Sequence, residues 1–242
     1  MSHREITLDR RALLRGAAAT AAGIGLLGGG LCRFAHADVL TREKRDAMTP
    51  DEIIDVMRKG NQRFLADERE KRSYLAQQRA SAAGQYPAAA ILSCVDSRAP
   101  AEVIMDLGIG DIFNARVAGN VTNPDILGSL EFACKLSGAK IAMVMGHTSC
   151  GAIKGAIDGA ELGNLTALLA KIRPAVDATA FTGERSSKNP AFVDAVARKN
   201  VELAMVQMRE QSPVLREMED QGKLDIAGAM YNLETGALEI FV

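Results

Sequence analysis

Short apolar runs alternate with amphipathic helical patterns along most of this chain of 242 residues, and this alternation is the strongest constraint on its fold. Each apolar run has the length of a buried β-strand. Strands that alternate with helices predict a mostly parallel sheet flanked by helices, so we expect a single α/β domain. The predicted strands are residues 88–92, 112–117, 141–145, 224–230 and 237–242, and the predicted helices are residues 124–136, 151–157, 162–176 and 191–208.

Local signals mark both ends of this region. Residues 38–50 are polar, and we expect them to form a loose lead-in. Thr49 then precedes Pro50 and two acidic residues, an arrangement that is typical of the start of a helix. At the other end, Glu234-Thr235-Gly236 separates the last two apolar runs and predicts a hairpin, so the C-terminal strand should be an antiparallel edge strand.

The first 37 residues differ in composition from the rest. A basic start is followed by an uncharged run at residues 16–32 and by Ala35-His36-Ala37. This order is typical of a secretory signal peptide, so we predict that residues 1–37 are removed and that residues 38–242 form the domain. The apolar run is short and glycine-rich for a membrane span, which predicts a periplasmic or secreted protein without a stable membrane anchor after processing.

The adjacent Arg10 and Arg11 resemble the twin-arginine export signal of bacteria. Asp9 and Leu13 depart from that signal, which usually has Ser or Thr and Phe at these positions. A general secretory signal or an uncleaved anchor remains an alternative.

The composition excludes some partners and narrows the chemistry. A net charge of −1 and the absence of Trp remove the electrostatic and stacking basis for nucleic-acid binding. After residue 37 the chain contains one histidine, His147, and three cysteines, Cys94, Cys134 and Cys150. An odd number of cysteines in an exported protein argues against a pure disulfide framework.

Two segments with reactive side chains directly follow the first and third predicted strands. Cys94 and Asp96 lie in one segment, and His147 and Cys150 lie in the other. The carboxyl ends of parallel strands form the edge of the sheet where α/β proteins place their sites. Zinc prefers sulfur and nitrogen ligands, and a catalytic zinc keeps one position open for water. Cys94, His147 and Cys150 are therefore candidate zinc ligands, and Asp96 is a possible fourth ligand that would close the site.

The spacing alone leaves other interpretations open. Buried cysteines are commonly plain core residues, and we assign Cys134 to core packing. A disulfide between Cys94 and Cys150 would suit an oxidising compartment. A serine hydrolase is also conceivable, since His147 has Ser97, Ser149 and Asp96 in plausible range.

The motif C-x-D-S-R at Cys94, followed later by G-H-x-x-C-G, resembles the β-class carbonic anhydrases of the plant-like type. Further similarities extend over residues 50–242, so the resemblance covers essentially the whole predicted domain. The segments that carry them are Gly60–Phe64, Phe113 with Arg116, Gly119-Asn120, Ser129–Ala133 and Tyr231–Leu238.

This resemblance implies reversible zinc-dependent hydration of CO₂ to bicarbonate and a proton, in a homodimer or homotetramer. It implies that Cys94, His147 and Cys150 bind Zn²⁺. It also implies a catalytic pair in which Arg98 keeps Asp96 ionised and directed at the attacking oxygen. Gln85 would donate a hydrogen bond to the substrate from across a dimer interface. The residues implied to contact the substrate are Gln85, Phe113, Ala118, Phe132 and Gly151.

The chain also departs from the resembled family. Phe132 stands where plant members commonly have Tyr, and Ala118 stands where Val is usual, so the pocket would be wider. Export is a departure too, because most members are intracellular. An α-class enzyme is excluded, because it needs three zinc-binding histidines and the predicted mature chain has one.

Two alternatives to CO₂ hydration remain. One is a carbonyl sulfide or carbon disulfide hydrolase on the same scaffold. The other is a non-catalytic zinc or redox-sensing protein. Asp96, Arg98 and Gln85 weigh against the second alternative, because a structural zinc site requires none of them.

Overall fold

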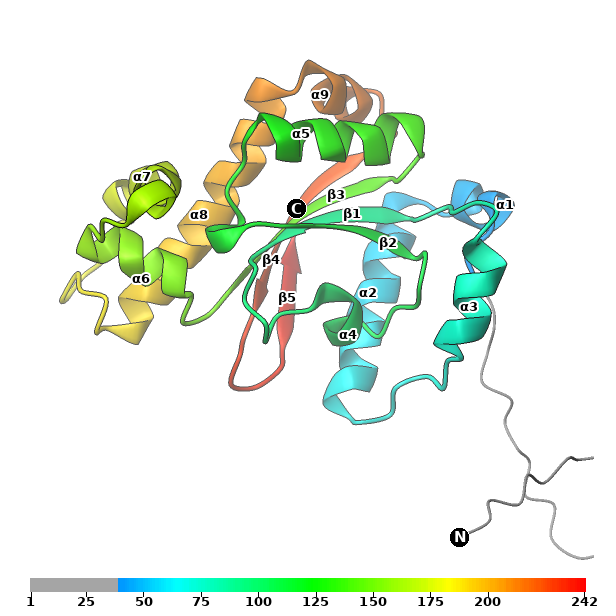
Figure 1. Ribbon diagram of the computed structural model, residues 1–242, viewed down its shortest axis with the longest axis horizontal. Helices are drawn as coiled ribbons and strands as arrows, with labels where there is room; N and C mark the ends of the chain where they lie inside the picture. Colours follow the sequence, from blue (N-terminus) through cyan, green and yellow to red (C-terminus); the bar gives the residue numbers. More distant parts are fainter. Residues whose placement is uncertain (1–38) are drawn as a thin grey trace, which may run out of the picture. The chain divides into compact units, whose positions relative to one another are not determined.

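A five-stranded sheet with helices on both faces forms the centre of the molecule (Figure 1). The computed structural model describes residues 39–242, so the predicted signal peptide at residues 1–37 lies outside the described residues. The strand order is β2-β1-β3-β4-β5, and only β5 is antiparallel to its neighbour. This confirms the predicted α/β fold with an antiparallel C-terminal edge. The strands are β1 (Ala89–Ser93), β2 (Ile112–Arg116), β3 (Ile141–His147), β4 (Asp225–Tyr231) and β5 (Leu238–Phe241).

Helices connect the parallel strands and cover the sheet. In the described part of the chain, none of them is both long enough and apolar enough for a membrane span. A short 3₁₀ helix (Ala118–Asn120) follows β2, and a π-helical turn (Phe132–Leu136) continues α5. The α-helices are α1 (Arg42–Ala47), α2 (Pro50–Leu65), α3 (Tyr74–Ser81), α4 (Ala101–Ile104), α5 (Pro124–Glu131), α6 (Gly151–Asp158), α7 (Gly163–Ala178), α8 (Pro190–Gln211) and α9 (Pro213–Asp220).

The central strands are apolar runs because both of their faces are buried. Every residue of β1 and β3 is buried. Side chains alternate between the two faces of a strand, so Ala89 and Ile91 pack toward α2 and α4, whereas Ala90 and Leu92 pack toward α5, α8 and α9 (Figure 1). Cys134, in the π-helical turn, belongs to the second of these cores and is 1% exposed.

A third core lies beyond the carboxyl ends of the strands. It contains side chains of α6, α7 and α8 together with Cys94 and Cys150. β1 and β3 are parallel neighbours whose register pairs Ser93 with Met145, so both strands deliver their following residues to this edge. The fold therefore places the two reactive segments next to each other.

The predicted loose lead-in is wrong for part of its length, because Arg42–Ala47 forms helix α1. Thr41 caps this helix by accepting a hydrogen bond from the Lys44 amide. Arg45 is 4% exposed and donates from Nη1 to the carbonyl of Ser137 at 2.6 Å. The helix is thus held by capping and by a long-range polar contact, neither of which produces an apolar stripe in the sequence. Helices α3, α4 and α9 were not predicted either.

Candidate metal centre

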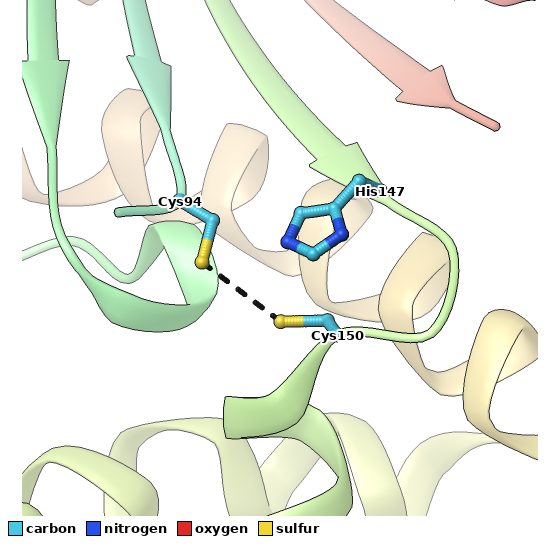
Figure 2. Close-up of side chains that lie close together, drawn as sticks. All are labelled: Cys94, His147 and Cys150. Atoms are coloured by element: carbon cyan, nitrogen blue, oxygen red, sulfur yellow. Dashed lines mark hydrogen bonds between the residues drawn. The ribbon is translucent and has the colours of Figure 1, made fainter. Parts of the chain in front are cut away.

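Three buried side chains converge where the ends of β1 and β3 meet the start of α6 (Figure 2). Cys94 directly follows β1, His147 ends β3, and Cys150 directly precedes α6. Their ligand-type atoms all lie within 4.8 Å of one another. We call these three residues the Cys–His–Cys cluster.

The spacing of the two sulfur atoms fits a metal better than a disulfide. The Sγ atoms of Cys94 and Cys150 are 4.0 Å apart. Two thiolates at about 2.3 Å from a tetrahedral ion would be about 3.8 Å apart, whereas a disulfide bond is about 2.05 Å long. The cysteines of the described residues are all free. The alternative of a Cys94–Cys150 disulfide is therefore not what the structure contains.

The imidazole of His147 is oriented for ligation through Nε2. Nδ1 donates a hydrogen bond to the carbonyl of Thr148 at 2.9 Å. That bond leaves the lone pair on Nε2, which is buried and has no hydrogen-bond partner. Neither ring nitrogen bonds a serine hydroxyl, so the arrangement does not form a serine hydrolase. A buried nitrogen of this kind fits a metal.

The two cysteine sulfurs are within hydrogen-bonding distance of each other. The hydrogen bond with Cys150 is the largest cause that lowers the pKa of Cys94, to about 4, against the opposing effect of burial. The same contact, with burial, raises the pKa of Cys150 above its usual range. A metal binds cysteine as the thiolate, so binding at this cluster requires both sulfurs to lose their protons.

The backbone of the 3₁₀ helix is in direct contact with the side chain of Cys94. The amide of Gly119 donates to the Cys94 sulfur at 3.3 Å. Gly119 has a φ of 67°, and a Cβ at this position would lie 2.5 Å from Cδ1 of Ile172. Asn200, on α8, holds the same turn by donating to the Gly119 carbonyl at 2.8 Å. Glycine is favoured here because a side chain would be strained at this positive φ and would meet the side chain of Ile172.

Asp96 and Arg98 form an ion pair beside the cluster. Oδ1 of Asp96 accepts hydrogen bonds from the amide and Nε of Arg98, and Oδ2 accepts one from Nη2 at 2.8 Å. The Arg98 side chain is the largest cause that holds the pKa of Asp96 well below its usual range. Oδ2 of Asp96 also lies 3.9 Å from Nε2 of His147. An ionised carboxylate therefore sits next to the cluster, with both oxygens bound to Arg98.

The residues expected to contact the substrate fall into two groups. Ala118 adjoins Gly119 in the 3₁₀ helix, and Gly151 directly follows Cys150, so both are near the cluster. Gln85 instead precedes β1, and Phe113 lies at the start of β2, at the opposite end of the sheet. Phe132 packs edge-to-face on Phe113 with ring centroids 6.2 Å apart.

Two members of this second group are exposed, at the end of the sheet that lies away from the cluster. The side chain of Phe132 is 51% exposed, and Gln85 is exposed as well. Phe113 and Phe132 line a cavity of about 560 Å³ between β2 and α5. Within one chain, these residues do not face the Cys–His–Cys cluster.

Two polar side chains that the sequence analysis did not select as site residues bind the segments that carry the cluster. Arg116, at the end of β2, donates from Nε to the carbonyl of Cys94 at 2.8 Å and from Nη2 to the carbonyl of Asp96. Asp194, on α8, accepts the amide of Ser149 at 2.8 Å. Both contacts involve backbone groups, which leave no residue-type signal in the sequence. Arg116 stood out only within the family resemblance.

Comparison with known proteins gives one consistent result. The family model described as carbonic anhydrase matches residues 89–238. Carbonic anhydrase 2 of Mycobacterium tuberculosis is 34% identical over 186 residues, which are 74% of this chain and 87% of that protein. A carbonic anhydrase of Pseudomonas aeruginosa is 31% identical over 195 residues, covering 78% of this chain and 86% of the relative. Crystal structures of two tetrameric β-carbonic anhydrases from Sordaria macrospora include a chain with a TM-score of 0.60 and 26% identity, covering 69% of this chain and 89% of that one.

Proposed function

This chain belongs to the carbonic anhydrase family and is a β-class enzyme that hydrates CO₂ reversibly with zinc; we propose that Cys94, His147 and Cys150 hold the zinc. The observation that carries this assignment is the convergence of two sulfurs and an unpartnered imidazole nitrogen in a buried cluster. Two thiolates and a neutral imidazole would balance the charge of Zn²⁺. Zinc bound there would activate water for attack at neutral pH.

Asp96 and Arg98 are the catalytic pair in this proposal. Arg98 keeps the carboxylate ionised, and a carboxylate can only accept hydrogen bonds. Asp96 would therefore accept a hydrogen bond from the attacking oxygen and so direct the oxygen's lone pair at CO₂. With Asp96 bound to Arg98 through both oxygens, the fourth position of the site is left for water. The released proton would pass to buffer, because the sequence after residue 37 has no second histidine.

The substrate pocket is completed by a second copy of the chain in this proposal. Ala118 and Gly151 lie near the cluster, whereas Gln85, Phe113 and Phe132 lie at the other end of the sheet. One CO₂ molecule can meet both groups only if two chains face each other. An exposed aromatic side chain beside a cavity, as Phe132 is, is also typical of surfaces that pack against a partner. The tetrameric state of the Sordaria macrospora enzymes supports a homodimer or homotetramer.

We further propose that the enzyme is exported, with residues 1–37 as a cleaved signal and the twin-arginine pathway as the route. The support comes from the sequence of Arg10 and Arg11, the uncharged run that follows, and the small-x-small site at Ala35–Ala37. Replacing both arginines with lysine should leave the precursor inside the cell. Unchanged export of this double variant would instead indicate the general secretory pathway.

Metal analysis and stopped-flow CO₂ hydration test the zinc assignment. The purified protein should contain about one zinc per chain. Cys94→Ala and His147→Ala should lose both the metal and the activity. Cys134→Ala is the matched control, because it removes a buried thiol outside the cluster and should keep both. Full zinc content in His147→Ala would refute the proposed ligand set, and carbonyl sulfide hydrolysis faster than CO₂ hydration would refute the substrate.

A further inference from the structure

The Arg116 side chain, on the neighbouring strand, is hydrogen-bonded to the segment that carries Cys94 and Asp96. The guanidinium of Arg116 reaches from the end of β2 and donates to two carbonyls of this segment, Nε to Cys94 at 2.8 Å and Nη2 to Asp96. A planar guanidinium that binds two acceptors fixes the angle between them as well as their position. Arg116 therefore determines where the segment stands relative to the sheet.

The segment that carries His147 and Cys150 is tied to α8 in a comparable way. Ser149, between these residues, has a φ of 54°, a conformation that L side chains rarely adopt. This turn presents the Ser149 amide to Asp194, whose Oδ1 accepts it at 2.8 Å. A charge-assisted hydrogen bond from a long, packed helix stabilises the unusual turn. Asp194 therefore fixes the relative positions of His147 and Cys150.

We propose that Arg116 and Asp194 are positioning residues that hold the two ligand-bearing segments at the separation a metal requires. The proposal rests on the zinc assignment above. The sulfur–sulfur distance of 4.0 Å joins the two segments, so it depends on how each is anchored. Without the hydrogen bonds from Arg116 or Asp194, the ligand-bearing segment would be less ordered before zinc binds. Part of the binding free energy would then be needed to order it, so the zinc affinity would fall.

The two residues should differ in one respect. Asp194 binds only the segment of His147 and Cys150, so its removal should act on metal affinity. Arg116 also binds the carbonyl of Asp96, so its removal should additionally displace the catalytic carboxylate. For fully zinc-loaded protein, Arg116→Ala should therefore lower kcat, whereas Asp194→Ala should lower kcat much less.

Zinc release from the loaded protein to a chromogenic chelator measures the affinity directly. We expect Asp194→Ala and Arg116→Ala to bind zinc about 10- to 100-fold more weakly than the parent protein. Asp194→Asn retains an oxygen that can accept the Ser149 amide and should recover most of this loss. Arg116→Lys can replace only one of the two hydrogen bonds and should fall between Arg116→Ala and the parent. Glu210→Ala on the exposed face of α8 and Arg216→Ala on α9 are the matched controls and should release zinc like the parent.

Cobalt-substituted protein gives a second readout that a general loss of stability would not change. Sulfur-to-cobalt and ligand-field absorption bands report the geometry of the ligand set, so they should shift in both alanine variants and return in Asp194→Asn. Parent-like affinity and spectra in the alanine variants would overturn the proposal. It would also be overturned if Asp194→Asn were as weak as Asp194→Ala, because the hydrogen bond would then not be the cause. Absence of zinc from the parent protein would instead refute the ligand assignment itself.

Discussion

The two ends of the parallel sheet differ in how completely one chain builds them. At the carboxyl ends of β1 and β3, each residue of the Cys–His–Cys cluster is at most 4% exposed. Arg116 and Asp194 bind the flanking backbone, and the Gly119 amide donates to the Cys94 sulfur. At the opposite end, Gln85 is exposed and Phe132 is 51% exposed. One chain thus forms the whole Cys–His–Cys cluster but only part of the proposed substrate site.

The distribution of unpartnered polar atoms shows the same difference. Among the described residues, the buried side-chain atoms without a hydrogen-bond partner are Ser93 Oγ, Asn120 Nδ2 and His147 Nε2. All three belong to the segments around the cluster. Unpartnered buried polar groups are costly, so their concentration at one end indicates where the chain is built to meet something polar.

Among variants that keep zinc, the largest effect should come from the charged pair at the metal end. Asp96→Asn should keep zinc but lower the hydration rate about 100-fold, because an amide can donate as well as accept and no longer pairs with Arg98. Arg98→Ala should have a similar effect, and the double variant should lose far less than the product of the two, since the pair acts as a unit. Stopped-flow hydration with zinc content checked for each variant is the measurement. Near-parent turnover in a zinc-loaded Asp96→Asn protein would remove Asp96 from the mechanism.

The end opposite the cluster exposes Phe132, but a buried ion-pair network lies close by. Asp106, whose side chain is 3% exposed, binds Arg63 and Arg72 beside the starts of β1 and β2. Burial by itself raises the pKa of Asp106, but the hydrogen bonds from Arg63, the Glu70 amide and Arg72 outweigh it, so the net shift is downward. The stabilisation is therefore fully present above the unfolded-state pKa and is lost as the pH falls through the lower folded-state pKa.

Asp106→Asn should consequently lower the free energy of unfolding at pH 7 by about 3 kcal/mol. The difference in the free energy of unfolding between the variant and the parent should become smaller as the pH is lowered toward the folded-state pKa of Asp106. Urea unfolding at several pH values measures this difference. Asp177→Asn removes the exposed partner of Arg173 and should change stability by less than about 0.5 kcal/mol. A gap that is constant with pH would show that shape, and not charge, matters at Asp106.

Gln85 tests whether the exposed end serves a second chain. Gln85→Ala should retain zinc and lose about tenfold in kcat/KM, the value of one hydrogen bond to substrate. Mixed oligomers of Gln85→Ala with metal-free His147→Ala should recover activity, because one of the two sites in each mixed dimer then has an intact cluster and an intact Gln85. Activity no greater than that of the Gln85→Ala chains alone would place Gln85 in the site of its own chain, or outside any site.

The sequence predicts the residues of the Cys–His–Cys cluster better than the side chains that orient the cluster, and the reason is physical. β1 and β3 are buried on both faces, so they are visible as apolar runs, and the residues that follow parallel neighbours must meet at one edge. Asp194 recognises a backbone amide, and which amide it meets depends on how α8 packs against the sheet. Helix α1 was missed for a similar reason, since Arg45 binds a carbonyl that is distant in sequence. Motif spacing specifies ligands but not the tertiary contacts that orient them.

The smallest effects should come from the same substitution, glycine to alanine, made at each end of the sheet. Their opposite signs test the difference between the two ends. At the metal end, Gly119→Ala should destabilise the protein by about 1 kcal/mol or more, because φ is 67° and the new methyl group would meet Ile172. Gly128, in α5 beside the cavity at the other end, is helical, and a Cβ there would have no heavy atom within 4 Å. Gly128→Ala should therefore raise the free energy of unfolding by about 0.5–1 kcal/mol, since alanine loses less conformational entropy than glycine in a helix. Urea unfolding gives both values, and sedimentation gives the oligomeric state. If Gly128→Ala instead weakened association, the partner chain would have to lie directly on α5, and the cavity beside Phe132 would be part of the interface and not open space.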